Sequence, residues 1–106
     1  MKTIPEKYEG RGKGDQKGFS FELLQRSSTN AVYIKRGHGG ASYEAMRIRT
    51  HKKPLFIQGI QIAEAGDEFL PSSNQWGQYG WTFSTLEQAQ AKFNEMEERD
   101  KKDTVK

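Results

Sequence analysis

The chain has no cysteine, and this absence removes several kinds of chemistry at once. Without thiols the protein has no disulfide, no thiolate zinc site and no cysteine nucleophile, which fits a reducing compartment. No apolar run approaches the roughly 18 to 20 residues that cross a bilayer, and the first residues, MKTIPEKYEG, lack the apolar centre of a signal peptide. The sequence therefore predicts a soluble cytoplasmic protein that does not associate with membranes.

Catalytic and metal-binding signatures are also missing from the sequence. The two histidines, His38 and His51, have no carboxylate nearby in sequence that would orient either one as a general base. No His, Asp or Glu lies at a metal-ligand spacing from His38. The serines do not occur in the sequence pattern of a nucleophile elbow. The early glycines are not followed by the Gly-Lys-Ser/Thr ending of a phosphate-binding loop. We expect no enzyme, metal or cofactor; a small enzyme stays an alternative if a histidine meets an acidic residue in space.

Charge is unevenly distributed along the chain, although its net value is only +3. Residues 1–53 carry +7 and residues 54–106 carry −4, counted from Lys, Arg, Asp and Glu. If the fold keeps the halves on different faces, the asymmetry creates a directional field that attracts nucleic acid or acidic proteins. The alternative is a mixed-charge surface that only keeps the protein soluble.

Three segments follow from the pattern of the chain. Residues 1–17 mix glycine with Arg and Lys and predict a flexible basic arm. Residues 18–98 predict one domain, and residues 99–106 a solvated tail.

Period-two alternation predicts strands in GFSFELLQRS, NAVYIKRG and ASYEAMRIRTHK, with turns between them. A fourth strand is predicted over LFIQGIQIA (residues 55–63), with a bulge at Gly59. A loop is predicted over EAGDEFLPSSNQ, and a short fifth strand over YGWTFST. The segment from Ser84 predicts a helix, because Glu87 follows at the capping-box spacing and one apolar stripe runs along it: Leu86, Ala89, Phe93 and Met96. The expected fold is α+β: an antiparallel sheet of four strands (three to five) with one C-terminal helix across one face, the other face being open.

The polar face of the third predicted strand is the best candidate for a binding surface. Residues spaced by two project from one face of a strand, so Arg47, Arg49 and His51 should form a cationic strip. Tyr43 lies on the same face, Lys35 is expected across from it, and Lys52 and Lys53 extend the charge. Guanidinium groups pair with phosphates and rings stack on bases, which favours nucleic acid. Alternatively the charges are solvated, and Arg49 pairs with Glu44 or Glu22.

The aromatic segment NQWGQYGWTF divides into two parts. Trp81 and Phe83 are predicted to pack in the core, because their strand leads directly into the helix. Trp76 has polar and glycine neighbours, so it either covers the end of the sheet or stacks on a ligand.

These observations predict a non-enzymatic protein that binds nucleic acid, specifically single-stranded DNA or RNA. The predicted contacts are Lys35, Tyr43, Arg47, Arg49, His51, Lys53 and Trp76. The alternative is a protein-interaction, inhibitor or accessory module acting on a protein partner, or a homodimer formed through a strand edge. In its arrangement the chain resembles small proteins of phages and mobile elements, but no motif ties it to a named family.

Overall fold

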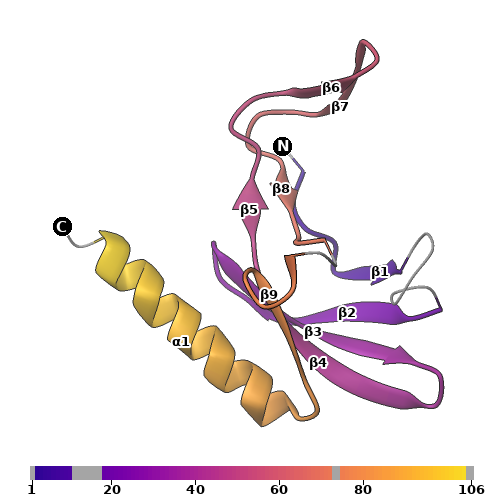
Figure 1. Ribbon diagram of the computed structural model, residues 1–106, viewed down its shortest axis with the longest axis vertical. Helices are drawn as coiled ribbons and strands as arrows, with labels where there is room; N and C mark the ends of the chain where they lie inside the picture. Colours follow the sequence, from indigo (N-terminus) through magenta and orange to yellow (C-terminus); the bar gives the residue numbers. More distant parts are fainter. Residues whose placement is uncertain (1, 11–17, 73–74, 105–106) are drawn as a thin grey trace.

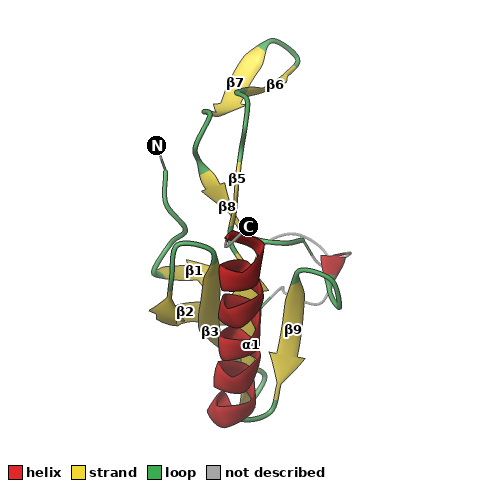
Figure 2. Ribbon diagram, turned by 90° about the vertical axis from the view of Figure 1, so that its left-hand side faces the viewer, coloured by secondary structure: helices red, strands yellow, loops and turns green. Residues whose placement is uncertain are grey.

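A computed structural model describes residues 2–10, 18–72 and 75–104 of the chain. Its main body is an antiparallel sheet with one long helix packed against one face (Figures 1 and 2). In spatial order the strands are β1 (Lys7–Glu9), β2 (Ser20–Arg26), β3 (Asn30–Gly37), β4 (Gly40–Arg47) and β9 (Gly80–Phe83), and the helix is α1 (Leu86–Thr104). The α+β class predicted from the sequence is confirmed, with five strands in the sheet.

The centre of the sheet is the hairpin of β3 and β4. His38 and Gly39, at its turn, have φ values of 52° and 78°, and two consecutive positive values are typical of a type I′ turn. That turn matches the natural twist of paired strands, so the pairing runs without interruption from Gly37 opposite Gly40 to Asn30 opposite Arg47. The turn predicted between these two strands is therefore confirmed.

Apolar side chains gather on both faces of this sheet. On the face under α1, Val32 meets Ala89 and Phe93, and partly buried Tyr43, Phe83 and Leu86 pack around them. The second cluster lies on the other face and comprises Ile4, Phe21, Ala31, Tyr33, Met46 and Ile48. The face that the sequence left open is thus largely occupied by the protein's own residues.

The predicted helix is present, but its ends differ from the prediction. The backbone N–H of Gln88 donates to Thr85 Oγ1 at 3.2 Å, so Thr85 rather than Ser84 is the N-cap. Helix α1 also continues to Thr104, through most of the segment predicted as a solvated tail. Asp100, in that segment, pairs with Arg47 of β4 at 2.8 Å, which ties the last turns to the sheet.

The first residues of the chain belong to the fold instead of forming a free arm. Strand β1 pairs with β2, with Tyr8 opposite Phe21 and the two rings stacked at 4.5 Å. Ile4 is buried, and the Tyr33 hydroxyl donates to the carbonyl oxygen of Pro5 at 2.6 Å. The sequence missed this because β1 is short and its order depends on contacts with distant strands. Residues 11–17 of the predicted arm lie outside the described residues.

After Arg47 the chain leaves the sheet to form a stalk and then a hairpin, as Figure 1 shows. The stalk consists of β5 (Arg49–Thr50) paired with β8 (Glu68–Phe69), and it carries β6 (Leu55–Ile57) paired with β7 (Ile60–Ala63). The prediction of one strand over residues 55–63 is therefore wrong. Gln58 and Gly59, with φ of 53° and 79°, reverse the chain, so Gly59 lies in a tight turn and not at a bulge.

Candidate functional site

Two of the predicted binding residues, Tyr43 and Arg47, lie on the sheet face that α1 covers. Tyr43 packs against the cluster around Val32 and Phe93. The Arg47 Nη1 atom donates to Asp100 Oδ1 at 2.8 Å, and both side chains are about a quarter exposed. The face expected to be open at these positions is consequently used to hold the helix.

Lys35 lies on the opposite face of the sheet from Tyr43. Ile34, not Lys35, pairs with Tyr43 across β3 and β4, and successive residues of a strand alternate between faces. The Lys35 ammonium lies 4.3 Å from the centroid of the Phe19 ring, a cation–π contact. Lys35 therefore does not extend a strip formed by Tyr43 and Arg47.

Arg49 and His51 belong to the stalk and are brought together by Phe69. The Arg49 guanidinium lies 4.8 Å from the centroid of the Phe69 ring and 4.3 Å from that of Tyr79. Its Nη2 atom also donates to Gln75 Oε1 at 2.6 Å. The His51 ring packs on Phe69 with centroids 4.5 Å apart. The contacts of Arg49 with Tyr79 and Gln75 link the stalk to the body of the protein, whereas His51 packs within the stalk.

Trp76 is half-buried and lies over β9, where its ring touches the backbone of Gly80. A Cβ atom at Gly80 would be only 2.6 Å from the ring, so the absence of a side chain there makes room for the indole. The indole Nε1 donates to Thr82 Oγ1 at 2.8 Å, and that hydroxyl donates to Glu44 Oε2 at 2.8 Å. Trp76 thus covers part of the sheet, the first of its two predicted roles.

Glu44, at the inner end of this chain of hydrogen bonds, is a buried carboxyl group. Burial raises the pKa of Glu44 above its usual value, and the hydrogen bond from Thr82 offsets part of that increase. The Oε1 atom is enclosed without a hydrogen-bond partner. A carboxyl group in such a position favours its protonated form more than an exposed one does.

Lys53 and its neighbour Lys52 are exposed at the base of the hairpin. The seven predicted contact residues therefore occupy the helix-covered face, the opposite face, the stalk and the hairpin base. Arg49 and His51 share the neighbour Phe69, and Arg47 and Arg49 share Tyr79, whose carbonyl oxygen accepts the Arg47 N–H and whose ring contacts the Arg49 guanidinium. No single strip contains Arg47, Arg49, His51 and Lys35 in the described structure.

The most unusual surface is one that the sequence analysis did not select, the hairpin of β6 and β7. It carries five exposed large apolar side chains: Leu55 (40% exposed), Phe56 (57%), Ile57 (54%), Ile60 (67%) and Ile62 (47%). No charged residue occurs between Lys53 and Glu64. Figures 1 and 2 both show the hairpin projecting away from the sheet and the helix. We call these five side chains the apolar hairpin surface.

The hairpin has two different faces. Ile57 lies opposite Ile60 next to the turn, and the register shifts between Leu55 and Phe56, where Ile62 has no paired residue in the ladder. Phe56 lies opposite Gln61 and faces the other way. Next to the turn, one face is therefore aliphatic, whereas the other combines an aromatic ring with an amide.

A sequence signal for this hairpin did exist. Gln58-Gly59 separates two short apolar runs, and a two-residue turn ending in glycine is the usual connection of a tight hairpin. The prediction failed because the apolar positions change parity between Ile57 and Ile60, and a bulge in one strand explains such a change as well as a turn does. Ile57 and Ile60 therefore fit one bulged strand as well as two paired strands.

The stalk beneath the hairpin is held from several sides. The backbone N–H of His51 donates to the carbonyl of Asp67 at 2.9 Å, and that of Gly66 donates back to the carbonyl of His51 at 2.7 Å. The Asp67 carboxylate accepts the N–H groups of Glu64 and Lys2, at 2.9 and 2.7 Å, and these bonds lower its pKa. Such contacts fix the direction in which the hairpin projects.

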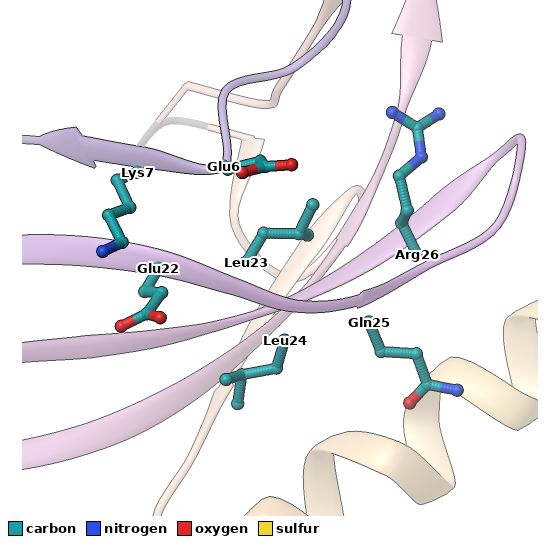
Figure 3. A pocket seen from close by; sticks show the side chains of 7 residues that line it. All are labelled: Glu6, Lys7, Glu22, Leu23, Leu24, Gln25 and Arg26. Atoms are coloured by element: carbon teal, nitrogen blue, oxygen red, sulfur yellow. The ribbon is translucent and has the colours of Figure 1, made fainter.

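A cavity of about 360 Å³ at the edge of β2 is a second candidate site. It lies where the pairing with β1 ends and is lined by Glu6, Lys7, Glu22, Leu23, Leu24, Gln25 and Arg26, shown in Figure 3. Leu24 is the unpaired residue of a β-bulge, and Figure 3 shows it on the opposite side of the strand from Leu23. Arg26 is already engaged by Glu68 through two hydrogen bonds of 2.9 and 2.7 Å. Charges of both signs and a strand edge make this a weaker site than the hairpin.

Two further kinds of site are not seen in the described part of the chain. Residues 2–10, 18–72 and 75–104 contain no group of three or more His, Asp or Glu side chains placed to hold a metal ion. Over the same residues, no helix has both the length and the apolar character needed to cross a membrane.

Comparison with known proteins gives no match: no family model, curated protein or solved structure is similar to this chain.

Proposed function

We propose that the chain is a small non-enzymatic binding module whose partner is a protein, and that the apolar hairpin surface makes the contact. The observation that carries this proposal is the exposure of its five large apolar side chains, between 40% and 67% each. At about 200 Å² for a fully exposed side chain, they present roughly 500 Å² of apolar surface. An apolar surface of that size matches the largest patch on a typical monomeric protein, and such patches are often functional.

The construction of the hairpin favours a polypeptide as its partner. A two-stranded ribbon leaves the backbone N–H and C=O groups along both outer edges available for pairing with another strand. An isolated hairpin is also only marginally stable in water, so a covering partner stabilises it. The fixed stalk lowers the conformational entropy lost on binding.

Nucleic acid is the second candidate, because Lys52 and Lys53 are exposed at the hairpin base. Binding through these lysines would weaken as salt rises, since phosphate contacts release counterions. This candidate has less support, because Arg47 is paired with Asp100 and Arg49 is held between two rings. Neither arginine presents a free guanidinium to a phosphate.

Site-specific photo-crosslinking in the source cell tests the proposal. A photoreactive phenylalanine analogue at Phe56 should give adducts that survive nuclease treatment and can be identified as protein by mass spectrometry. The same analogue at Gln90, exposed on α1, should give no such adduct. If position 56 gives no protein adduct, or only adducts that nuclease removes, the proposal is wrong.

An oligonucleotide titration separates the two candidates. Fluorescence anisotropy with a labelled single strand at low and high salt should show no specific binding under this proposal. Salt-sensitive binding that Lys52→Ala with Lys53→Ala abolishes would instead favour nucleic acid.

A further inference from the structure

Residues 2–6 run from the stalk to the edge of the sheet, and we call them the N-terminal strap (Figure 1). We propose that this strap is a releasable attachment that sets the direction of the hairpin, and that Glu68 is the positioning residue through which it acts. The functional part rests on the proposed function, because a hairpin held in one direction loses less conformational entropy when its partner binds. The structural part can be tested without any partner.

The strap contacts the stalk at one end and the sheet at the other. The backbone N–H of Lys2 donates to Asp67 Oδ1 at 2.7 Å, and the Lys2 carbonyl accepts the Glu68 N–H at 2.9 Å. At the sheet end, the carbonyl of Pro5 accepts the Tyr33 hydroxyl at 2.6 Å. A displacement of the stalk relative to the sheet therefore has to break bonds at one end of the strap.

Glu68 binds the strap through its side chain as well as its backbone. Its Oε1 atom accepts the backbone N–H of Ile4 at 3.0 Å. The same carboxylate accepts two hydrogen bonds from the guanidinium of Arg26, the last residue of β2, at 2.9 and 2.7 Å. These bonds hold the pKa of the Glu68 carboxyl below its usual value, so it is ionised at neutral pH. One carboxylate thus ties β8 to both the strap and the sheet.

The stalk needs this support because its own pairing is short. The ladder between β5 and β8 contains two residue pairs, and a two-stranded ribbon of that length is at best marginally stable in water. The contact of Arg49 with Tyr79 attaches the β5 side to the body, and the strap attaches the β8 side. If the strap is released, the stalk should bend about the Arg49 attachment and the hairpin should change direction.

The strap can leave without unfolding the body. Among residues 2–6, Ile4 alone is buried, and the other four are exposed. Segments near a chain end that have few buried contacts open at a lower free energy than the core does. The cluster that Ile4 joins is otherwise formed by residues of β2, β3 and β4 and by Ile48, so most of it stays in place.

Double electron–electron resonance tests the strap, because the chain has no cysteine and two can be introduced as attachment points for spin labels. Gln61→Cys on β7 and Gln90→Cys on α1 are both exposed and report the distance from the hairpin to the body. We expect a single narrow distance distribution when the strap is intact. Glu68→Ala and Ile4→Ala should each broaden it at least about twofold, because each removes a contact of the strap.

Two controls separate release of the strap from a general loss of structure. Glu22→Ala removes a different carboxylate, which pairs with Arg36 at 3.0 Å on the sheet and not on the stalk, and should leave the distribution narrow. Labels at Ala41→Cys on β4 and Gln90→Cys on α1 both lie on the body. Their distance distribution should stay narrow in every variant.

Three outcomes overturn the structural part. The distribution between hairpin and body is already broad in the chain with an intact strap; or it stays narrow in both Glu68→Ala and Ile4→Ala; or Arg26→Ala broadens it as much as Glu68→Ala while Ile4→Ala does not. In the last case the ion pair of Arg26 with Glu68, and not the strap, holds the stalk.

The photo-crosslinking experiment tests the functional part. With the photoreactive group at position 56, Ile4→Ala should lower the yield of protein adduct at least about threefold, since the hairpin is no longer held in one direction. An unchanged yield in a variant whose distribution is broadened shows that the functional part is wrong. A narrow distribution in both variants with adducts at position 56 overturns the inference but not the proposed function. A broadened distribution without any adduct supports the strap and overturns the proposed function.

Discussion

Replacing Arg49 by alanine distinguishes a structural role for this residue from the predicted role in nucleic-acid binding. The guanidinium lies between the rings of Phe69 and Tyr79 and donates to Gln75 Oε1 at 2.6 Å. Phe69 belongs to the stalk, whereas Gln75 and Tyr79 lie beyond it in the segment that leads to β9. Arg49 therefore links the stalk to the main sheet, and its removal should loosen that junction.

The magnitude follows from the contacts that are lost. Each cation–π contact is worth about 0.5–1 kcal/mol at a partly exposed site. A hydrogen bond from a charged donor contributes about 1.5 kcal/mol. Together they predict that Arg49→Ala lowers the free energy of unfolding by about 2.5–3.5 kcal/mol, or roughly 10–28 °C in the melting temperature of a chain of this size.

Urea denaturation of the wild type, Arg49→Ala and Arg49→Lys measures this effect. Lysine keeps the charge but not the planar group that stacks between two rings, so it should recover less than half of the loss. Lys53→Ala, in the exposed hairpin base, is the matched control and should change stability by less than about 0.5 kcal/mol. If Arg49→Ala is as stable as the wild type, the reasoning about the junction is refuted.

Three more predictions concern the core and its buried groups. Phe93→Ala should cost about 3–4 kcal/mol in urea denaturation, because the ring is 5% exposed and packs on Val32; a loss below 1 kcal/mol would contradict this packing. Since burial raises the pKa of Glu44, the folded state holds its proton more tightly, and the free energy of unfolding should fall as the pH rises above the usual 4.5. Glu44→Gln should remove that fall, and an unchanged pH profile would argue against it. Gly80→Ala should displace the Trp76 ring, destabilise the protein by about 1–3 kcal/mol and shift the indole emission in a Trp81→Phe background; an unchanged spectrum would count against the contact.

The sheet and helix were predictable because their signals are local. Alternation in β2, β3 and β4 and the apolar stripe of α1 each arise within a few residues, and the buried residues Phe21, Phe93 and Met96 confirm them. The strand that leads into the helix was also found, with Phe83 packed against the cluster of Val32, Ala89 and Phe93. Such patterns need no knowledge of distant parts of the chain.

The candidate site was not predictable by the same means. The strip from Tyr43 to His51 assumed one continuous strand, but β4 ends at Arg47 and the chain turns into the stalk after Ile48. The partner of Arg47 is Asp100, which lies 53 residues later and was assigned to a solvated tail. Alternation tells which residues share a face, but it does not tell which face a helix will cover.

The sheet has one core on each side, and β3 contributes to both. Ala31 and Tyr33 pack in the cluster that the N-terminal residues cover, while Val32 packs under α1. Loss of β3 from the sheet would empty both cores at once, so neither layer can melt while the other stays native. The sheet and helix should therefore unfold in a single cooperative transition, whereas the hairpin, which shares no core with them, can open by itself and exchange its amide protons earlier.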